Sequence, residues 1–347
     1  MENMAHLESR SPASPRIRKK LSRRCFLKTP LIEGSLTVYL PGMNGTFEGE
    51  YTDSFTKALT KNCIIVLICI AINFINSVLI HTFQKNEIFF TKPRYILFIH
   101  MVINDMLHLI LTVLVLTITY VFYILPVPMC MVFILFIIFT TENTPLNLAC
   151  MALECYIAIC YPLHHTKICT VKRTHVLLAL IWLITVISGI SDLFITLASS
   201  PINFFYTKVV CLRTSVFPSP VIAQKRNFSY IVLLFVVWFV IVYTYFKILI
   251  SAKTASKDIK KARNTIILHG FQVLMCMTVY ATPTLRERLI QLFPKSGPDI
   301  QFIVYVTVQV MPRSLSPIVY GIKDTTFRKH MKANLQVYTR GSPVKNL

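Results

Sequence analysis

The stretch MCMVFILFIIFTTENTPLNLACMALECYIAIC, from Met129 to Cys160, decides what kind of fold this chain can adopt. Its only charged residues are Glu142 and Glu154. A helix needs about 20 consecutive apolar residues to cross the hydrocarbon core of a bilayer. This stretch is longer than that, and it therefore predicts a transmembrane helix.

Six other runs along the chain have the same character. The whole sequence is 54% hydrophobic and 15% charged, whereas soluble domains average roughly 45–50% apolar and 25% charged residues. We therefore predict an all-α membrane protein, a seven-transmembrane helix bundle. The predicted spans are 63–84, 95–123, 129–160, 175–197, 228–250, 265–285 and 299–321.

Basic residues in the short connections indicate the orientation. They gather after the first, third and fifth spans and after the seventh, and such connections face the cytoplasm. An odd number of spans then places the amino end outside, where the sequon Asn44-Gly45-Thr46 predicts glycosylation at Asn44. Each connection contributes several of these cations: Lys85, Lys92 and Arg94; Lys167, Lys172 and Arg173; Lys253, Lys257, Lys260, Lys261 and Arg263; Arg328, Lys329 and Lys332.

Other classes of protein fit the composition poorly. The formal net charge is +21, but the cations lie between membrane-length runs rather than on one basic face, which argues against a nucleic-acid partner. The ten cysteines form no CxxC pair or Cys/His metal spacing, so we expect no metal and no cofactor. No HExxH, GxSxG or glycine-rich phosphate loop is present, which argues against an enzyme.

The two ends of the chain are predicted separately. Residues 1–42 are basic and lack an apolar signal-peptide core, so we expect a disordered leader or a mis-assigned extension, with Met43 as the true start. Residues 43–62 would form the extracellular terminus, 63–321 the seven-transmembrane domain and 322–347 the cytoplasmic tail. In that tail Phe327, Met331 and Leu335 recur every fourth residue beside cations, which predicts a short amphipathic helix on the membrane, although a frayed tail is the alternative.

Two motifs connect these spans with a known family. The end of the third span reads MALECYIAICYPLHH from Met151, which resembles the MAxERYVAICxPLxH signature of odorant receptors. The seventh span ends in PRSLSPIVYG from Pro312, similar to the PRxLSPxxYG form of the fish type. Further matches are Asn76, Asp105, NTPLNLA from Asn143, Trp182, and KARNT from Lys261 with His269. The resemblance extends from about Met43 to Lys332.

The resemblance implies a rhodopsin-like G-protein-coupled receptor of the plasma membrane. Such a receptor binds a small-molecule odorant within the bundle, lies in membrane lipid, and signals to a heterotrimeric G protein of the stimulatory olfactory type that raises cAMP. The implied coupling and switch residues are Glu154, Cys155, Tyr156, Tyr245, Ser316, Pro317 and Tyr320. Pro317 removes a backbone donor, so we expect a hinge in the seventh span, with a static kink as the alternative.

An intramembrane polar cluster is expected from three of these positions. Asn76, Asp105 and Ser316 would converge if the bundle packs as the family's does. A guanidinium inside a span should not remain unpaired, so we predict an ion pair between Asp105 and Arg313. The alternative is that Arg313 reaches the interface or contacts water.

The extracellular side holds a predicted disulfide. Cys130 opens the third span and Cys211 lies in the long second extracellular connection, both on the oxidising side, so a bond between them would tie the loop over the bundle mouth. Two unpaired thiols are the alternative. The family often has further cysteines in this loop, and Cys211 is alone there.

Cys155 departs most from the family. The family has an arginine there, which reaches the G protein and pairs with the neighbouring acid in the inactive receptor. Cysteine does neither, so we expect Glu154 to be without a partner and coupling to be weaker.

The ligand pocket is expected between the outer halves of the third, fifth, sixth and seventh spans. It would be largely apolar, and Glu142 would either anchor a cationic or donor group of the ligand or stay protonated beside a neighbour. The predicted lining residues are Ile134, Ile137, Ile138, Thr141, Glu142, Ser229, Leu233, Tyr280, Thr284, Val306 and Gln309.

Three alternatives remain open. The first is a non-olfactory rhodopsin-like receptor for an amine, peptide or lipid, although Ile137 stands where amine receptors have an aspartate. The second is an odorant receptor whose coupling Cys155 impairs. The third is a seven-span transporter, which should show an inverted repeat.

Overall fold

The computed structural model describes residues 35–37, 52–122, 124–251 and 327–333, together with parts of the stretch 266–314. The chain divides into two compact units, Met1–Ala58 and Leu59–Leu347. In the first unit, β1 (Ser35–Thr37) pairs antiparallel with β2 (Thr52–Ser54). The sequence predicted no regular structure in residues 1–42, and β1 is a short exception because its order comes from backbone pairing with a distant strand.

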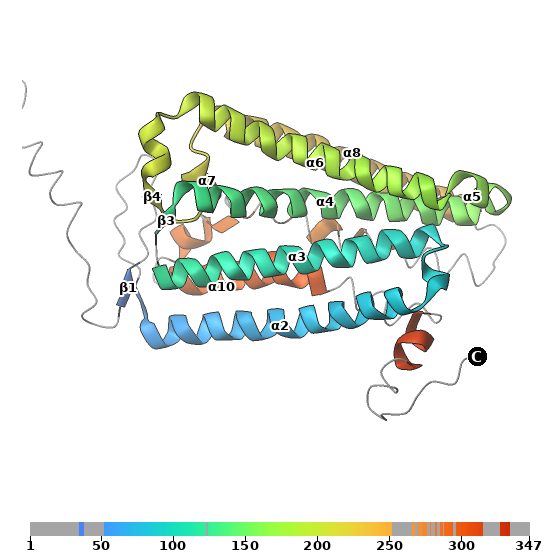
Figure 1. Cartoon of the computed structure of the whole chain (residues 1–347), viewed down its shortest axis with the longest axis horizontal. Coiled ribbons are helices and arrows are strands. Elements are labelled where there is room, and N and C mark those ends of the chain that lie inside the picture. The colour runs from blue at the N-terminus through green and yellow to red at the C-terminus, as the bar shows by residue number, and fades with distance from the viewer. Residues whose placement is uncertain are drawn as a thin grey trace, which may run out of the picture. The chain divides into compact units, whose positions relative to one another are not determined.

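Within the described residues, five helices are long and apolar enough to cross a membrane, and they correspond to the first five predicted spans (Figure 1). The first of them begins at Phe55 instead of near residue 63, so part of the predicted extracellular terminus is helical. The five helices are α2 (Phe55–Lys85), α3 (Pro93–Phe122), α4 (Val127–Cys160), α6 (Val171–Ser199) and α8 (Pro220–Ser251).

The last two predicted spans are described less completely. Of the sixth, 265–285, the structure describes scattered helical residues. The seventh begins with α10 (Gly297–Tyr305), continues as the π-helical segment η4 (Val306–Val310) and is helical again to Ser314. Residues 315–321, which hold the predicted Pro317 hinge, lie outside the described residues. A π-helical turn inserts an extra residue and is frequently found at functional sites.

Local sequence explains where several helices begin. Pro93 opens α3 and Pro162 opens the short α5 (Pro162–Ile168), at a position where the missing backbone N–H of proline is not needed. The Thr170 hydroxyl accepts a hydrogen bond from the backbone N–H of Arg173 at 3.3 Å and so caps α6.

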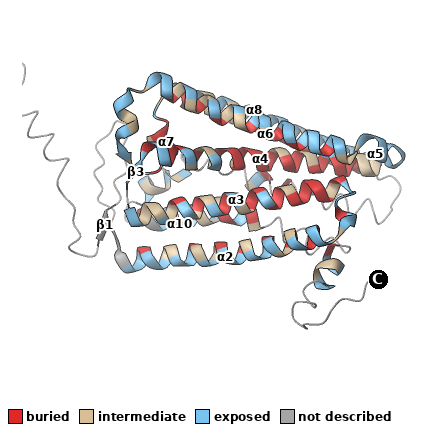
Figure 2. Cartoon of the chain, viewed as in Figure 1, coloured by how far each residue is buried: buried red, intermediate tan, exposed pale blue. Residues whose placement is uncertain are grey.

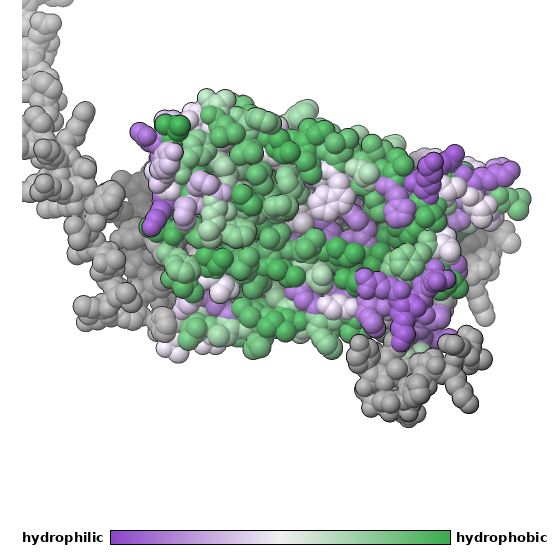
Figure 3. Space-filling view, viewed as in Figure 1, coloured by the Kyte–Doolittle hydropathy of each residue, from purple (hydrophilic) through white to green (hydrophobic). Residues whose placement is uncertain are grey.

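Helix α4 is the centre of the second unit. It packs against α3, α6 and α8, and Figure 2 shows it as the most buried of the long helices. The outer faces of α2, α6 and α8 are exposed and carry large apolar side chains such as Phe74, Phe194 and Phe235. The face drawn in Figure 3 is accordingly hydrophobic over the long helices, and hydrophilic side chains gather beside α5. These apolar faces are suited to contact with lipid.

Close packing of α4 against α6 depends on Gly189. A Cβ built on Gly189 would overlap the ring of Phe139 in α4. We therefore expect Gly189→Ala to destabilise the bundle by about 1–3 kcal/mol, because the ring must move to make room. The measurement is the thermal unfolding midpoint of the purified protein in detergent. The double variant Gly189→Ala/Phe139→Leu should recover part of the loss, and an unchanged midpoint in Gly189→Ala would contradict the argument.

The loop between α6 and α8, predicted from the sequence to be the second extracellular loop, has a fold of its own. It contains η2 (Ile202–Tyr206), β4 (Lys208–Val209) and α7 (Arg213–Val216), and β4 pairs with β3 (Leu125–Pro126) ahead of α4. The sequence did not predict these elements. Apolar side chains of the loop join those of α4 in one cluster, here called the loop core: Val115, Leu125, Val127, Cys130, Met131, Ile134, Ile138, Cys211, Val216, Phe217 and Ile222.

The predicted tail helix is present over residues 327–333. Phe327 is fully buried, and its ring lies 5.1 Å from that of Phe89 and 5.7 Å from that of Phe98. Met331 packs against the same apolar cluster, and the next predicted position, Leu335, lies outside the described residues. The amphipathic pattern thus forms a helix, and the buried ring of Phe327 anchors it to the bundle.

Candidate ligand and signalling sites

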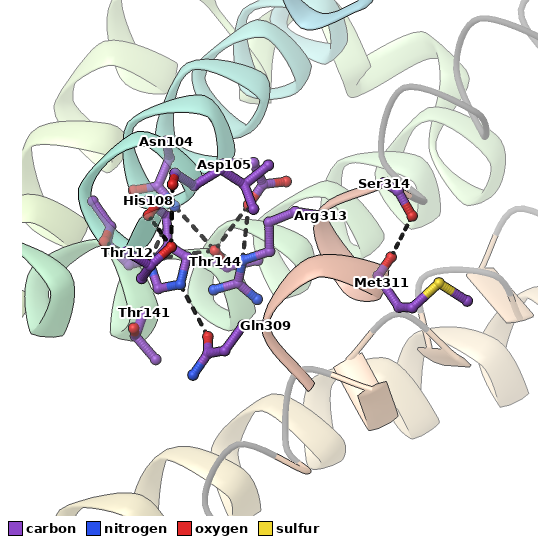
Figure 4. Close-up of polar contacts among 12 residues, drawn as sticks. Asn104, Asp105, His108, Thr112, Thr141, Thr144, Gln309, Met311, Arg313 and Ser314 are labelled. Carbon is purple, nitrogen blue, oxygen red and sulfur yellow. Dashed lines mark hydrogen bonds and ion pairs between the residues drawn. The ribbon is translucent and has the colours of Figure 1, made fainter. Parts of the chain in front are cut away.

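A buried ion pair joins α3 to the seventh span. Arg313 Nε lies 3.7 Å from Asp105 Oδ1, and both side chains are 1% exposed (Figure 4). Thr144 of α4 donates a hydrogen bond to the same carboxylate oxygen at 3.4 Å. This geometry agrees with the ion pair predicted from the sequence, and it links three helices deep inside the unit.

Polar side chains next to this pair extend it toward η4. His108 Nε2 lies 3.0 Å from Gln309 Oε1, and His108 Nδ1 lies 3.0 Å from the hydroxyl of Thr140 (Figure 4). Asn104 donates to the Thr140 carbonyl and to the Thr144 hydroxyl, each at 3.0 Å. His108 thus has a polar partner at each ring nitrogen, one in α4 and one in the seventh span. The sequence signal for this polar network was the presence of polar residues inside otherwise apolar spans.

Asn76 is placed differently from the other members of the predicted cluster. Its side chain is fully buried, and both amide atoms make no hydrogen bond within the part of the chain that the structure describes. Its expected neighbour Ser316 lies outside that part. Convergence of Asn76 with Asp105 therefore remains a prediction.

The end of α4 at Cys160, which the sequence predicts to face the cytoplasm, differs from the prediction in one contact. Glu154 is buried, and its Oε1 lies 3.0 Å from Nε2 of His165 in α5. The expectation that Glu154 has no partner because Cys155 replaces arginine is thus wrong. The loop helix α5 turns back and supplies an imidazole, a contact that linear spacing could not reveal. Cys155 itself is buried.

Aromatic contacts tie the same end of α4 to α8. The ring of Tyr156 lies 5.9 Å from that of Tyr161 and 5.9 Å from that of Tyr243 in α8, both edge-on. Tyr245 is half-buried against the core beside them. Of the other predicted switch residues, Ser316, Pro317 and Tyr320 lie outside the described residues, as do Lys260 and the cluster up to Arg263.

The predicted disulfide is formed in the structure. Cys130 and Cys211 are bonded, with their Cα atoms 5.5 Å apart, across a separation of 81 residues. The bond fixes the loop between α6 and α8 to the start of α4, where the loop core covers Ile134 and Ile138. These two predicted ligand contacts are therefore buried beneath the loop.

The other predicted pocket residues are spread over several surroundings. Ile137, Thr141, Ser229 and Leu233 are half-buried on α4 and α8, and the Thr141 hydroxyl donates to the Ile137 carbonyl at 2.6 Å. Gln309 contacts His108, whereas Val306 packs with the apolar residues of α2 and α3. Tyr280 and Thr284 lie outside the described residues. The structure therefore gathers the pocket residues only in part.

A group of charges at the outer ends of α6 and α8 was missed in the sequence. The outer ion cluster consists of Asp192 in α6, Arg213 in α7 and Lys225 in α8. Asp192 Oδ2 lies 3.0 Å from Arg213 Nη2, and Asp192 Oδ1 lies 2.6 Å from Lys225 Nζ. Asp192 lies near the end of a predicted span, and Arg213 and Lys225 lie in the connection before the next one, where charges are usually solvated, so only their partners reveal the cluster.

Neighbouring groups stabilise the outer ion cluster. Arg213 also donates a short hydrogen bond to the hydroxyl of Tyr230. Burial opposes the charge on Arg213, but Tyr230 and Asp192 outweigh it and raise the pKa of the guanidinium. Glu142 is buried within reach of the charges of Arg213, Asp192 and Lys225. The predicted acid of the third span thus lies beside a charged network instead of in an apolar pocket.

Membrane-length helices around a central α4, a disulfide-bound extracellular loop and a buried ion pair between helices define a seven-transmembrane receptor. The family model described as 7 transmembrane receptor (rhodopsin family) matches residues 75–320. The chain belongs to that family, and its fold is the seven-transmembrane bundle predicted from the sequence.

Two relatives narrow the class. Odorant receptor 131-2 of Danio rerio is 29% identical over 299 residues, which cover 84% of this chain and 91% of the relative. Olfactory receptor 4K15 of Homo sapiens is 23% identical over 227 residues, covering 62% and 66%. The resemblance to odorant receptors is therefore confirmed, and the relatives are receptors, not enzymes.

Proposed function

We propose that this chain is an odorant receptor of the plasma membrane with its amino end outside. It binds a small-molecule odorant within the bundle and passes the signal to a heterotrimeric G protein of the stimulatory olfactory type, which raises cAMP. Both relatives are named as odorant or olfactory receptors, which supports this proposal over a non-olfactory receptor.

The observation that carries the proposal is the tethered loop over the outer half of α4. The disulfide holds the loop core on Ile134 and Ile138, close to Glu142, so a ligand that enters from outside meets the loop and α4 together. A ligand changes the receptor only through a difference in its affinity for two arrangements of the bundle. Because the loop is bonded covalently to α4, a ligand that contacts the loop can favour one arrangement of α4 over the other.

At the opposite end, the contacts of the buried residues Glu154 and Tyr156 support the proposal that the G protein binds at this end of α4. Glu154 pairs with His165, and Tyr156 contacts α8 through Tyr243. A shift of α8 relative to α4 would break the tyrosine contact and alter the position of α5. We expect this shift to accompany activation.

The first test is a cAMP reporter in cells that display the epitope-tagged chain. The cells are screened with amino acids, amines, carboxylic acids, bile acids and small volatile organics, and an amino-terminal tag should be accessible without permeabilisation. An agonist should raise cAMP only in cells with surface receptor. A carboxyl-terminal tag accessible from outside would reject the proposed topology.

Coupling should improve when the family's arginine is restored. We expect Cys155→Arg to raise the maximal agonist-driven cAMP response about tenfold, since one charge-assisted hydrogen bond corresponds to about 1.5 kcal/mol. The measurement is the concentration-response curve, normalised to surface expression. Cys150→Arg, five residues earlier on α4, is the control for simply adding a cation. An unchanged response in Cys155→Arg would show that His165 already performs the role of the missing arginine.

A further inference from the structure

We propose that one face of α8 binds an anionic phospholipid of the cytoplasmic leaflet, with the lipid phosphate at Lys247 and an acyl chain in the apolar groove beside it. The inference goes beyond the proposed function and rests on it only for the orientation of the chain in the membrane. It assigns a lipid of defined charge to a defined surface of the receptor.

The surface consists of two rows of side chains on α8. Residues four apart lie on the same face of a helix, so each row follows the helix axis. The rows line an open hollow of about 240 Å³, here called the α8 groove. Its lining is apolar except for one lysine: Phe239, Val242, Tyr243, Phe246, Lys247 and Ile250.

The α8 groove is open to the surroundings of the receptor. Phe239 is 62% exposed, Phe246 54% and Ile250 63%. The rings of Phe235 and Phe239 lie 6.3 Å apart and those of Phe239 and Tyr243 lie 6.1 Å apart, with nearly parallel planes. The stacked rings form a flat wall along which an extended acyl chain can make many dispersion contacts.

The groove spans the depths at which a phospholipid has its headgroup and its chains. Lys247 lies four residues before the end of α8 at Ser251, which corresponds to about 6 Å along the helix. The sequence predicts that this end faces the cytoplasm. Phe239 lies about 12 Å further into the span. The cation is therefore at the headgroup level, and the aromatic wall extends into the hydrocarbon.

Lys247 is directed to the groove and has no acid to neutralise it. Its Nζ lies over the ring of Tyr243, 5.6 Å from the ring centre, so a cation–π contact holds the ammonium group at the groove. Lys247 makes no ion pair in the part of the chain that the structure describes, and α8 contains no Asp or Glu. The ring covers one side of the ammonium group, and its other donors can bind a phosphate oxygen.

Charge complementarity favours an anionic lipid over a zwitterionic one. The sequence from Ala252 to Asn264, which follows α8, contains five cations and one acid, Asp258. The cytoplasmic leaflet is rich in anionic lipids, and each basic residue near its surface strengthens the attraction about fivefold. A lipid without net charge gains little from this excess of cations.

A second copy of the chain is a less suitable occupant of the groove. Two copies with the same orientation in one membrane have their two-fold axis along the membrane normal. A symmetric contact through this face therefore brings both Lys247 side chains together at one depth. Because α8 has no acid to offset them, the two like charges would repel each other.

The groove also adjoins the end of α4 at which the G protein is proposed to bind. Tyr243 lines the groove, and its ring lies 5.9 Å from that of Tyr156 in α4. A lipid that packs on Tyr243 therefore contacts a residue of the interface between α4 and α8.

The experiment is native mass spectrometry of the full-length receptor, purified in detergent and depleted of lipid. The probes are dioleoyl phosphatidylserine and dioleoyl phosphatidylcholine, which have the same acyl chains and differ in net charge. We expect the first phosphatidylserine to bind about fivefold more tightly than the first phosphatidylcholine, the effect of one basic residue at an anionic surface.

Variants of the groove separate the charge from the apolar wall. Lys247→Gln should lower the affinity for phosphatidylserine about fivefold and leave that for phosphatidylcholine unchanged, whereas Lys247→Arg should keep the preference. Val242→Trp fills the groove and should weaken the binding of both lipids. Lys85→Gln is the matched control, because Lys85 is an exposed lysine at the end of α2, on the same predicted side of the membrane and outside the groove.

Three results would overturn the inference: equal affinities of the unmodified receptor for the two lipids, an unchanged preference in Lys247→Gln, or an equal loss in Lys85→Gln. A receptor dimer that Val242→Trp dissociates, without any lipid preference, would assign the groove to a second copy. Failure of the proposed function looks different, because lipid binding needs neither an agonist nor a G protein. Phosphatidylserine binding without any agonist response in cells would reject the signalling role and leave the lipid site intact.

Discussion

Replacing Asp105 by asparagine should remove most of the receptor from the cell surface. The substitution leaves the Arg313 guanidinium buried at 1% exposure beside a neutral amide. Breaking a buried ion pair by removing one partner costs about 3–5 kcal/mol, because an uncompensated charge remains in a medium of low dielectric constant. Surface labelling of an amino-terminal tag, together with the thermal midpoint of the purified protein, measures the loss.

Two further variants separate the ion pair from other effects of Asp105. The charge swap Asp105→Arg/Arg313→Asp should traffic better than either of its single variants, because the pair is kept with its polarity reversed. Glu87→Gln changes an exposed acid outside the spans and should shift the midpoint by less than about 0.5 kcal/mol. A charge swap that traffics no better than the single variants would contradict the ion pair between Asp105 and Arg313.

Loss of the disulfide is the second large effect that we expect. The bond between Cys130 and Cys211 closes a loop with a separation of 81 residues, for which the chain-entropy relation gives about 4.5 kcal/mol of stabilisation. Cys211→Ser should therefore greatly reduce both surface expression and the thermal midpoint. Binding of extracellular ligands should fall with them, because the loop core loses its attachment to α4.

The comparison among cysteine variants tests the origin of this effect. The double variant Cys130→Ser/Cys211→Ser should be no less stable than Cys211→Ser alone, since one bond is lost in both. Cys63→Ser removes an exposed free thiol of α2 and should change little. A Cys211→Ser receptor with normal expression and an unchanged midpoint would show that the loop holds its place through the loop core alone.

Parts of the site were predictable because lipid imposes strong requirements on single residues. An arginine inside a span needs a counter-charge, so Asp105 and Arg313 could be paired from the amino-acid sequence alone. The family motifs placed Glu154, Cys155 and Tyr156 at the cytoplasmic end. The partner of Glu154 could not be predicted, because His165 reaches it only through the turn between α4 and α5.

The outer ion cluster could not be predicted from the sequence. Asp192 lies near the end of a predicted span, and Arg213 and Lys225 lie in the connection that follows it, so each could be interpreted from the sequence as a solvated charge. The structure shows that they form two ion pairs, with distances of 2.6 and 3.0 Å, across three elements. The π-helical segment η4 is a similar case, since hydropathy does not distinguish it from an ordinary helical turn.

The amino-acid sequence by itself determined the seven-span architecture and the family that the chain resembles, and it predicted the orientation in the membrane. Hydropathy and the distribution of cations are properties of the linear sequence. They determine membrane insertion whatever the packing of the helices. Only the tertiary structure decided that Asp192 meets Arg213 and Lys225, how the disulfide-bound loop covers α4, and that an imidazole lies beside Glu154 in place of the missing arginine. Those contacts depend on the rotation and depth of helices that are far apart in the chain.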